Sequence, residues 1–402
     1  MLVRYLIHPA LLVTILFLGQ LVFWAVFMPE RATIPGAADK YYSASALLLW
    51  ILLFLTFLTG ITLGSCIKLF RKMKSLRMSF TSWWRWASVI LLISLLGEFV
   101  YVRLFLQQPG LIKEAFFVGN LAILGETVRA KKIVGLSSLN NLFLLGEAIL
   151  VFLAFHPKTP VSLRKRAVRW LWFLGILVLV HALFLAARMF FAYYIMILLG
   201  GLFVLKFQER KVSWKMALVT FLLLIGATWT GELLRSGLYY SRLASLPLTS
   251  REVHSYVWQR LVQGYLAADF NNALVILDCK PALQVLYTTM FAFILKNPYS
   301  YKECPNWESS YGTVNVLALW WFDWGYGAFI VAFMVGMALG VFYRWRSYVF
   351  ELDSRGLFFL IAFPGLFSII RINYFFLTIF VLPFLALCAI TCLTLLRKSL
   401  YN

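Results

Sequence analysis

Long apolar runs alternate with short polar stretches along the whole 402-residue chain. Each run holds about 20 largely apolar residues, which is the length that crosses a hydrocarbon core of roughly 30 Å as a helix. We place ten such runs at 10–28, 44–66, 83–102, 138–155, 169–187, 189–205, 216–233, 317–343, 356–371 and 373–396. The pattern predicts an all-α polytopic membrane protein with about ten transmembrane helices, forming a single integral-membrane domain over residues 1–402.

The polar stretches between the runs are rich in lysine and arginine, and the formal net charge is +21. If the N-terminus is cytoplasmic, the basic clusters at 68–77, 164–169, 206–215, 344–346 and 397–398 all fall on the cytoplasmic side, as the positive-inside rule requires. We therefore assign the charge to membrane topology and expect no nucleic-acid partner. Both termini are predicted to be cytoplasmic, and the first run, which lacks a small-residue cleavage site, is predicted to be a retained helix.

Two long connections fall at the outer face in this topology. Residues 103–137 mix apolar and charged residues and suit an interfacial segment. Residues 235–316 are too polar in their first half to span a membrane, and we expect them to form a large helical cap loop. Cys279 and Cys304 both lie in this loop, where an oxidising compartment would permit a disulfide. The sequence leaves their pairing open.

Two arginines stand in very short outer turns, against the positive-inside trend. Arg188 lies in LFLAARMFFAYY and Arg371 in SIIRINYFF. An ionised group at this depth is costly unless it pairs with an anion, faces water or extends to the headgroups. The arginines either serve such a structural role or converge on an anionic ligand, because a guanidinium binds phosphate through two parallel hydrogen bonds.

Ionisable residues inside the predicted spans are the next candidates. Glu98 and Glu147 are either functional or pair with Arg103, with His181 or with each other. His181 precedes Arg188 by seven residues, so the two would share one helix face and could line one cavity. A hydrogen-bonded interior histidine is the alternative for His181.

Several motifs of soluble transferases are missing from the sequence. The chain contains no CxxC or HExxH metal motif, no GxxxxGK[ST] or GxGxxG loop and no Asp-x-Asp pair. We therefore expect no metal and no cofactor. If the chain is a transferase, its donor should carry its own leaving group, and a lipid diphosphate fits that requirement.

The stretch TVNVLALWWFDWGYGAFIVAFMVGMALGVFYRW, 313–345, resembles a pattern of bacterial O-antigen polymerases of the Wzy type. In that family a Thr or Asn precedes an apolar helix with Asp-aromatic-Gly-x-x-Gly, and DWGYG departs from it by its Gly-x-Gly spacing. QGYLAADFNNALVILD, 263–278, is similar to the family's cap segment. The chain also resembles the family in having one large outer loop, 235–316, late in the sequence.

The resemblance implies a GT-C-like, metal-independent glycosyltransferase of the bacterial inner membrane. It would polymerise undecaprenyl-pyrophosphate-linked oligosaccharide repeat units into O-antigen or a related surface polysaccharide at the periplasmic face, as part of lipopolysaccharide biosynthesis. A chain-length regulator protein is an expected partner besides the lipid-linked glycans and the bilayer. Outer-face arginines essential in the family would match Arg188, Arg371 and some of the arginines of the cap loop.

On this basis we assign site residues of two kinds. The catalytic candidates are Arg188, Arg371, Asp323, Glu252 and His254, of which the last three are able to accept a proton from a hydroxyl. The substrate-binding candidates are Arg235, Arg242, Arg251, Arg260, Tyr265, Asn315 and Trp321. Two of the four cap arginines are expected to serve structure only, and the aromatic residues either stack on sugars or lie at the membrane interface.

Three other functions stay open at this point. O-antigen ligases share the architecture, but their His-Asn-x-x-Leu motif corresponds to Val314, Asn315, Val316 and Leu317 here, and the missing histidine favours a polymerase. A lipid-linked glycan flippase or other transporter would carry polar residues through the membrane midplane, whereas the basic residues here gather toward the two faces. A scaffold subunit without chemistry is the third possibility.

Overall fold

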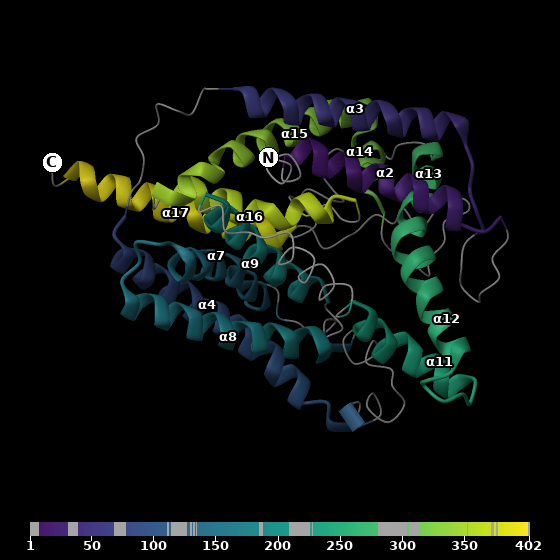
Figure 1. Ribbon diagram of the computed structural model, residues 1–402, viewed down its shortest axis with the longest axis horizontal. Helices are drawn as coiled ribbons and strands as arrows, with labels where there is room; N and C mark the ends of the chain where they lie inside the picture. Colours follow the sequence, from purple (N-terminus) through teal and green to yellow (C-terminus); the bar gives the residue numbers. More distant parts are fainter. Residues whose placement is uncertain are drawn as a thin grey trace. The chain divides into compact units, whose positions relative to one another are not determined.

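The computed structural model is helical, with no β-strand in the part of the chain that it describes. It describes residues 8–30, 39–67, 78–110, 112–113, 127–128, 131, 133, 135–184, 188–208, 226, 228–279, 304, 314–351, 353–370, 374 and 377–400. The chain forms two compact units (Figure 1). Unit 1 comprises Met1–Met73, Gln259–Trp345 and Gly365–Leu377, and unit 2 comprises Lys74–Trp258, Arg346–Pro364 and Thr378–Asn402.

Six helical stretches are long and apolar enough to cross a membrane. They are Pro9–Phe27, Ala44–Cys66, Phe80–Leu106, Ser137–Phe155, Val316–Arg344 and Ile379–Leu396. Together with α8 (Val161–Phe184), α9 (Arg188–Gln208) and α16 (Ser354–Ser368), nine of the ten predicted runs fall on helices. The other run, 216–233, lies mostly outside the described residues. The class of an all-α membrane protein is thus confirmed, while the number of ten spans stays a prediction.

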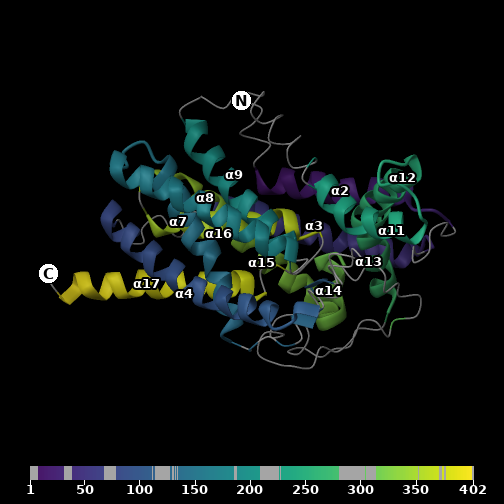
Figure 2. The ribbon, with the colours of Figure 1, turned by 90° about the horizontal axis from the view of Figure 1, so that it is seen from below.

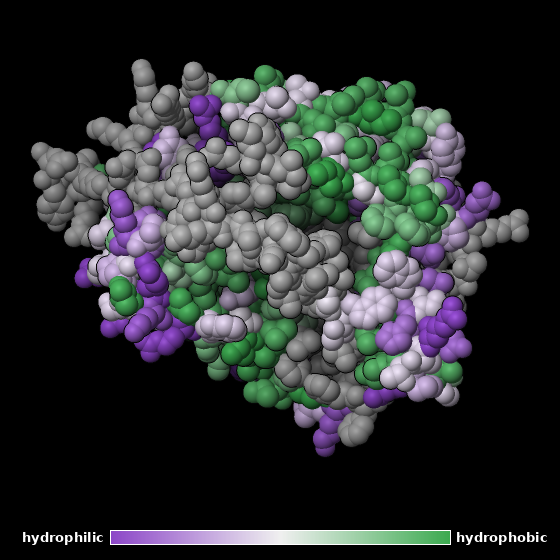
Figure 3. All heavy atoms as spheres, in the orientation of Figure 1, coloured by the Kyte–Doolittle hydropathy of each residue, from purple (hydrophilic) through white to green (hydrophobic). Residues whose placement is uncertain are grey.

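The outward faces of these helices are apolar. In α4 (Phe80–Leu106), Val89, Leu92, Leu96 and Phe99 repeat every three or four residues and are each 48–66% exposed. Hydrophobic side chains also cover much of the surface near α3 (Figure 3). Large exposed apolar areas of this kind are unfavourable in water. These faces therefore suit lipid contact, while the opposite face of α4 is buried in unit 2.

Unit 1 is built around the close packing of two helices, α3 (Ala44–Cys66) and α15 (Ala328–Arg344), which lie side by side (Figures 1 and 2). Each helix carries two glycines four residues apart: Gly60 and Gly64 in α3, and Gly336 and Gly340 in α15. A Cβ atom at Gly64 would overlap the carbonyl oxygen of Met337, and one at Gly340 would overlap that of Ile61. This small-xxx-small pattern lets two backbones touch in a membrane helix pair.

Aromatic rings fill the rest of the core of unit 1. Phe17 of α2 (Pro9–Phe27) stacks on Phe54 of α3 with ring centroids 5.1 Å apart. Trp50 meets Phe270 of α13 (Ala268–Asp278) edge-on at 4.9 Å. These large buried side chains attach α2 and α13 to the α3–α15 pair.

The predicted run 317–343 is interrupted in the structure. Helix α14 (Val316–Trp324) ends at Gly325, whose φ of +51° is a conformation that glycine adopts at little cost. A short 3-10 turn, η7 (Gly325–Gly327), then leads into α15. Gly325 therefore allows a break between α14 and α15 that a hydropathy pattern does not reveal.

Unit 2 surrounds one fully buried helix, α7 (Phe143–Phe155). Every residue from Phe143 to Ala154 is buried, because α4, α8, α9 and α17 (Thr378–Leu400) pack around it. The 3-10 turn η2 (Ser137–Leu142) precedes α7 and packs on α4 and α17. A helix that is apolar on all sides is expected in such a position.

Candidate functional site

A buried network of amide groups links three distant segments of unit 1. The Asn315 side chain caps α14, since its Oδ1 accepts a hydrogen bond from the Leu317 N–H at 3.0 Å. Its Nδ2 donates to Oε1 of Gln20 in α2 at 2.8 Å, and Gln20 Nε2 donates to the carbonyl oxygen of Ile370 at 2.8 Å. Arg371, the next residue, lies outside the described residues. The network thus holds the backbone where the Arg371 turn begins.

The segment 263–278, part of the predicted cap loop, lies in the same region. The backbone N–H of Asn315 donates to the Asp269 carbonyl oxygen at 3.4 Å, and that of Val316 donates to the Ile369 carbonyl oxygen at 3.3 Å. Asp269 and Asn315 are both fully buried. Segments 263–278 and 313–345 and the start of the Arg371 turn therefore meet in unit 1.

The amide network should contribute measurably to stability. Asn315→Ala removes the cap and leaves a buried oxygen of Gln20 without its donor, and such a group costs about 1–3 kcal/mol. We expect a lower melting temperature of the purified protein in detergent. Ser79→Ala is the matched control, because Ser79 caps α4 from an exposed position. Equal effects of the two substitutions would contradict a special role of the buried network.

A second polar cluster fixes the end of α13. The Tyr41 hydroxyl donates to Oδ2 of Asp278 at 2.6 Å, and the Ser45 hydroxyl donates to Oδ1 at 3.1 Å. The hydrogen bond with Asp278 raises the pKa of Tyr41 to about 12. Cys279, the following residue, forms a disulfide with Cys304. The pairing that the sequence left open is thus present.

A helical hairpin, residues 233–259, of which all but Gln259 belong to unit 2, carries five of the predicted site residues. Its elements are η3 (Leu233–Gly237), α11 (Leu238–Leu243) and α12 (Arg251–Gln259). The hairpin contains Arg235 in η3, Arg242 in α11, and Arg251, Glu252 and His254 in α12. We call it the cap hairpin.

Close packing holds the cap hairpin together. A Cβ atom at Gly237 would lie 2.9 Å from Val257 Cγ2, so this glycine lets the two arms approach. The rings of Tyr240 and Tyr256 stack with centroids 4.3 Å apart. The Trp229 ring is nearly parallel to that of His254 at 5.9 Å.

The outer surface of the cap hairpin is basic and aromatic. Arg242, Arg251, Glu252 and Trp258 are exposed, and hydrophilic side chains gather over α11 and α12 (Figure 3). Guanidinium groups bind phosphate oxygens in pairs of hydrogen bonds. Indole and phenol rings favour the membrane interface, where lipid headgroups lie. The surface therefore suits an anionic headgroup or glycan.

The other predicted residues are distributed over both units. Arg188 is the first residue of α9 in unit 2, while Arg260 and Tyr265 lie in the π-helix η4 (Arg260–Ala267) of unit 1. Trp321 and Asp323 lie in α14 and are buried, with 8% and 3% of their surfaces exposed. The Trp321 ring meets Tyr326 edge-on at 5.3 Å. Little of Trp321 is thus available to stack on a sugar in this conformation.

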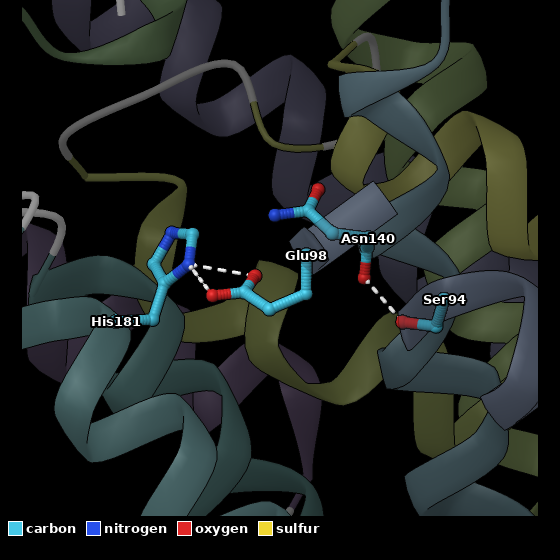
Figure 4. Close-up of polar contacts among 4 residues, drawn as sticks. All are labelled: Ser94, Glu98, Asn140 and His181. Atoms are coloured by element: carbon cyan, nitrogen blue, oxygen red, sulfur yellow. Dashed lines mark hydrogen bonds and ion pairs between the residues drawn. The ribbon is translucent and has the colours of Figure 1, made fainter. Parts of the chain in front are cut away.

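Unit 2 also contains a hydrogen-bonded histidine–glutamate pair among apolar helices. His181 Nδ1 lies 2.8 Å from both carboxylate oxygens of Glu98, with His181 on α8 and Glu98 on α4 (Figure 4). The pair borders a cavity of about 20 Å³ that Ser94, Asn140 and Phe143 also line, enough for about one water molecule. Of the partners left open for Glu98, the structure selects His181.

The prediction that His181 and Arg188 share one helix face is wrong. Helix α8 ends at Phe184 and α9 begins at Arg188, so the two residues belong to different helices. Phe190 of α9 nevertheless packs on the His181 ring at 4.8 Å. The first turn of α9 therefore lies beside the His181–Glu98 pair.

Glu147 is the other acidic residue of the predicted spans, and it is fully buried in α7. Among the described residues neither of its carboxyl oxygens has a hydrogen-bond partner. An unsatisfied buried polar group costs about 1–3 kcal/mol. We therefore expect Glu147→Leu to raise the melting temperature of the purified protein. A lower melting temperature would show that the carboxyl group stabilises the fold after all.

The fold and these polar groups define an all-α integral-membrane protein. Comparison with protein families, with curated proteins and with solved structures finds no match for this chain. A more specific assignment therefore depends on the residues and geometry described above.

Proposed function

We propose that the protein is a metal-independent membrane glycosyltransferase that polymerises undecaprenyl-pyrophosphate-linked oligosaccharide repeat units. One observation carries the proposal: the two polymerase-like segments, 263–278 and 313–345, are hydrogen-bonded to each other, and the second of them also bonds to Ile369, two residues before Arg371. They are far apart in sequence, so their meeting beside a predicted catalytic arginine is not a consequence of chain connectivity. The GT-C-like fold and the ten spans belong to the same proposal.

The reaction requires stabilisation of the charge on the leaving lipid diphosphate and removal of a proton from the acceptor hydroxyl. The bond between the sugar carbon and the pyrophosphate oxygen breaks, and a bond forms from that carbon to a hydroxyl oxygen of the acceptor glycan. The leaving lipid diphosphate gains negative charge, which Arg188 and Arg371 would stabilise. The hydroxyl proton passes to a base, for which Asp323, Glu252 and His254 are the candidates.

The cap hairpin would bind the lipid-linked substrate. Its exposed Arg242, Arg251 and Trp258 offer the groups that phosphate and sugar faces require. Arg235, on the same hairpin, is a further candidate of the same kind. Arg260, Tyr265, Asn315 and Trp321 of unit 1 are the further substrate-binding candidates. A chain-length regulator is the expected protein partner.

We further propose that the site faces the periplasm from the bacterial inner membrane, with both termini in the cytoplasm. The Cys279–Cys304 disulfide supports this, because disulfides form in oxidising compartments such as the periplasm. Both cysteines lie in the predicted cap loop, 235–316.

The proposal is testable in cells of the source bacterium. Deleting the coding sequence should reduce the surface polysaccharide to chains of one repeat unit, and re-expression should restore long chains. Retention of long polymer in undecaprenyl-linked form, without transfer to its final acceptor, would instead indicate a ligase. Accumulation of repeat units in the cytoplasmic leaflet would indicate a flippase.

A further inference from the structure

The Glu98–His181 pair joins two ionisable side chains, on α4 and α8, among the apolar helices of unit 2. His181 is 6% exposed, and the Glu98 side chain is 14% exposed. Two ionisable groups at this depth are expensive and by default mark a functional site. The pair is not needed to join α4 to unit 2, because Ser94 on the same helix already donates to the Asn140 carbonyl oxygen at 3.0 Å.

The cavity beside the pair has a second polar wall. Asn140 is 4% exposed, and its amide points toward the space next to the Glu98 carboxylate (Figure 4). In the described part of the chain this amide has no hydrogen-bond partner, and neither has Nε2 of His181. A polar cavity of this size holds a water molecule when several polar groups face it.

We infer that Glu98, His181 and Asn140 form an intramembrane proton-binding site, which takes its proton from hydronium that reaches the cavity and leaves a water molecule there. The imidazole ring is suited to this because it gains and loses a proton near neutral pH. A proton that binds Nε2 leaves an O–H bond of hydronium and forms an N–H bond. The Glu98 carboxylate, which faces Nδ1, balances the resulting positive charge.

The other ionisable groups near the site are few. Besides Glu98, α4 carries Tyr101, whose ring meets His181 edge-on at 5.3 Å, and Arg103 one turn further along. Helix α7 carries Glu147, and α9 carries Arg188, Tyr193 and Tyr194. Helix α17 carries Cys388, Cys392, Arg397 and Lys398, but no Asp, Glu, His or Tyr. Glu98 is thus the one carboxylate in hydrogen-bond contact with the ring, in the described residues.

The site is separate from the proposed glycosyl transfer and stands if that function fails. Neither Arg188 nor Arg371 belongs to the site or enters its test. The proposed role of unit 2 is that this site binds and releases a proton within the membrane.

Nitrogen-15 spectra of the histidine rings test the site directly. The full chain, labelled at histidine and held in lipid bilayers, contains four histidines, and His181→Gln identifies the signal of interest. We expect the His181 ring to change from neutral to imidazolium as the pH falls from about 8 to about 5. Glu98→Gln keeps the side-chain shape but removes the carboxylate that faces Nδ1, and should therefore change the ratio of imidazolium to neutral ring at a given pH.

Two further variants separate proton binding from a structural role. Glu30→Gln, which removes an exposed carboxylate, should leave the His181 signal unchanged. Asn140→Leu, which fills the cavity, should slow exchange of the ring proton with water. A wild-type His181 ring that stays neutral throughout this pH range would overturn the inference, as would an unchanged signal in folded Glu98→Gln.

Discussion

Replacing Gly64 or Gly340 with leucine is expected to prevent unit 1 from folding. At both positions a side chain would overlap a carbonyl oxygen of the facing helix, and a backbone atom cannot rotate away as a side chain can. Overpacking typically costs about 1–3 kcal/mol and more where the backbone must move. We expect the purified yield of monodisperse protein to fall sharply for leucine and partly for alanine.

Gly19 in α2 provides the control for this prediction. Among the described residues, no atom lies within 4 Å of a Cβ added at Gly19. Gly19→Leu should therefore leave yield and melting temperature close to those of the wild type. If Gly64→Leu and Gly340→Leu behave like Gly19→Leu, the close contact of α3 and α15 is refuted.

Replacing Arg188 or Arg371 with alanine is expected to reduce polymer formation by about 10²–10³-fold. Removing one preorganised donor from a site that stabilises a developing anion has an effect of that size. The Gln20–Ile370 hydrogen bond holds the backbone at the residue just before Arg371. Lysine keeps the charge but loses the paired hydrogen bonds, so the lysine variants should retain intermediate activity.

Polymer formation is measured in membranes that contain equal amounts of the wild-type protein and of each variant. Arg166→Ala is the control, since Arg166 is an exposed residue of the basic cluster 164–169. It should form polymer at the wild-type rate. Full activity in folded Arg371→Ala would remove this arginine from the mechanism.

The helices were largely predictable because membrane-spanning runs are long and almost purely apolar. The predicted run 44–66 coincides with α3, Ala44–Cys66. The break at Gly325 was missed, because hydropathy reports the residue type and not the backbone conformation. The complete burial of α7 was missed as well, since lipid and protein interior are both apolar and one sequence does not distinguish a lipid-facing leucine from a buried one.

The site was predictable only at the level of residue types. Asn315 was selected from its place before an apolar helix, but its partner Gln20 is 295 positions away and carries no local signal. The pairing of Glu98 with His181 was one of several that the sequence allowed. The contact between α3 and α15 had a visible signal, because both helices contain GxxxG, yet that motif does not reveal which helices pair.

Reconstitution of the purified protein with undecaprenyl-pyrophosphate-linked repeat units tests the proposed function most directly. Glycans separated by length after incubation without metal or nucleotide should form a ladder that grows by one repeat unit at a time. The same protein with Arg371→Ala should give almost none of it. Repeat units that remain single with the active, folded protein would contradict glycan polymerisation.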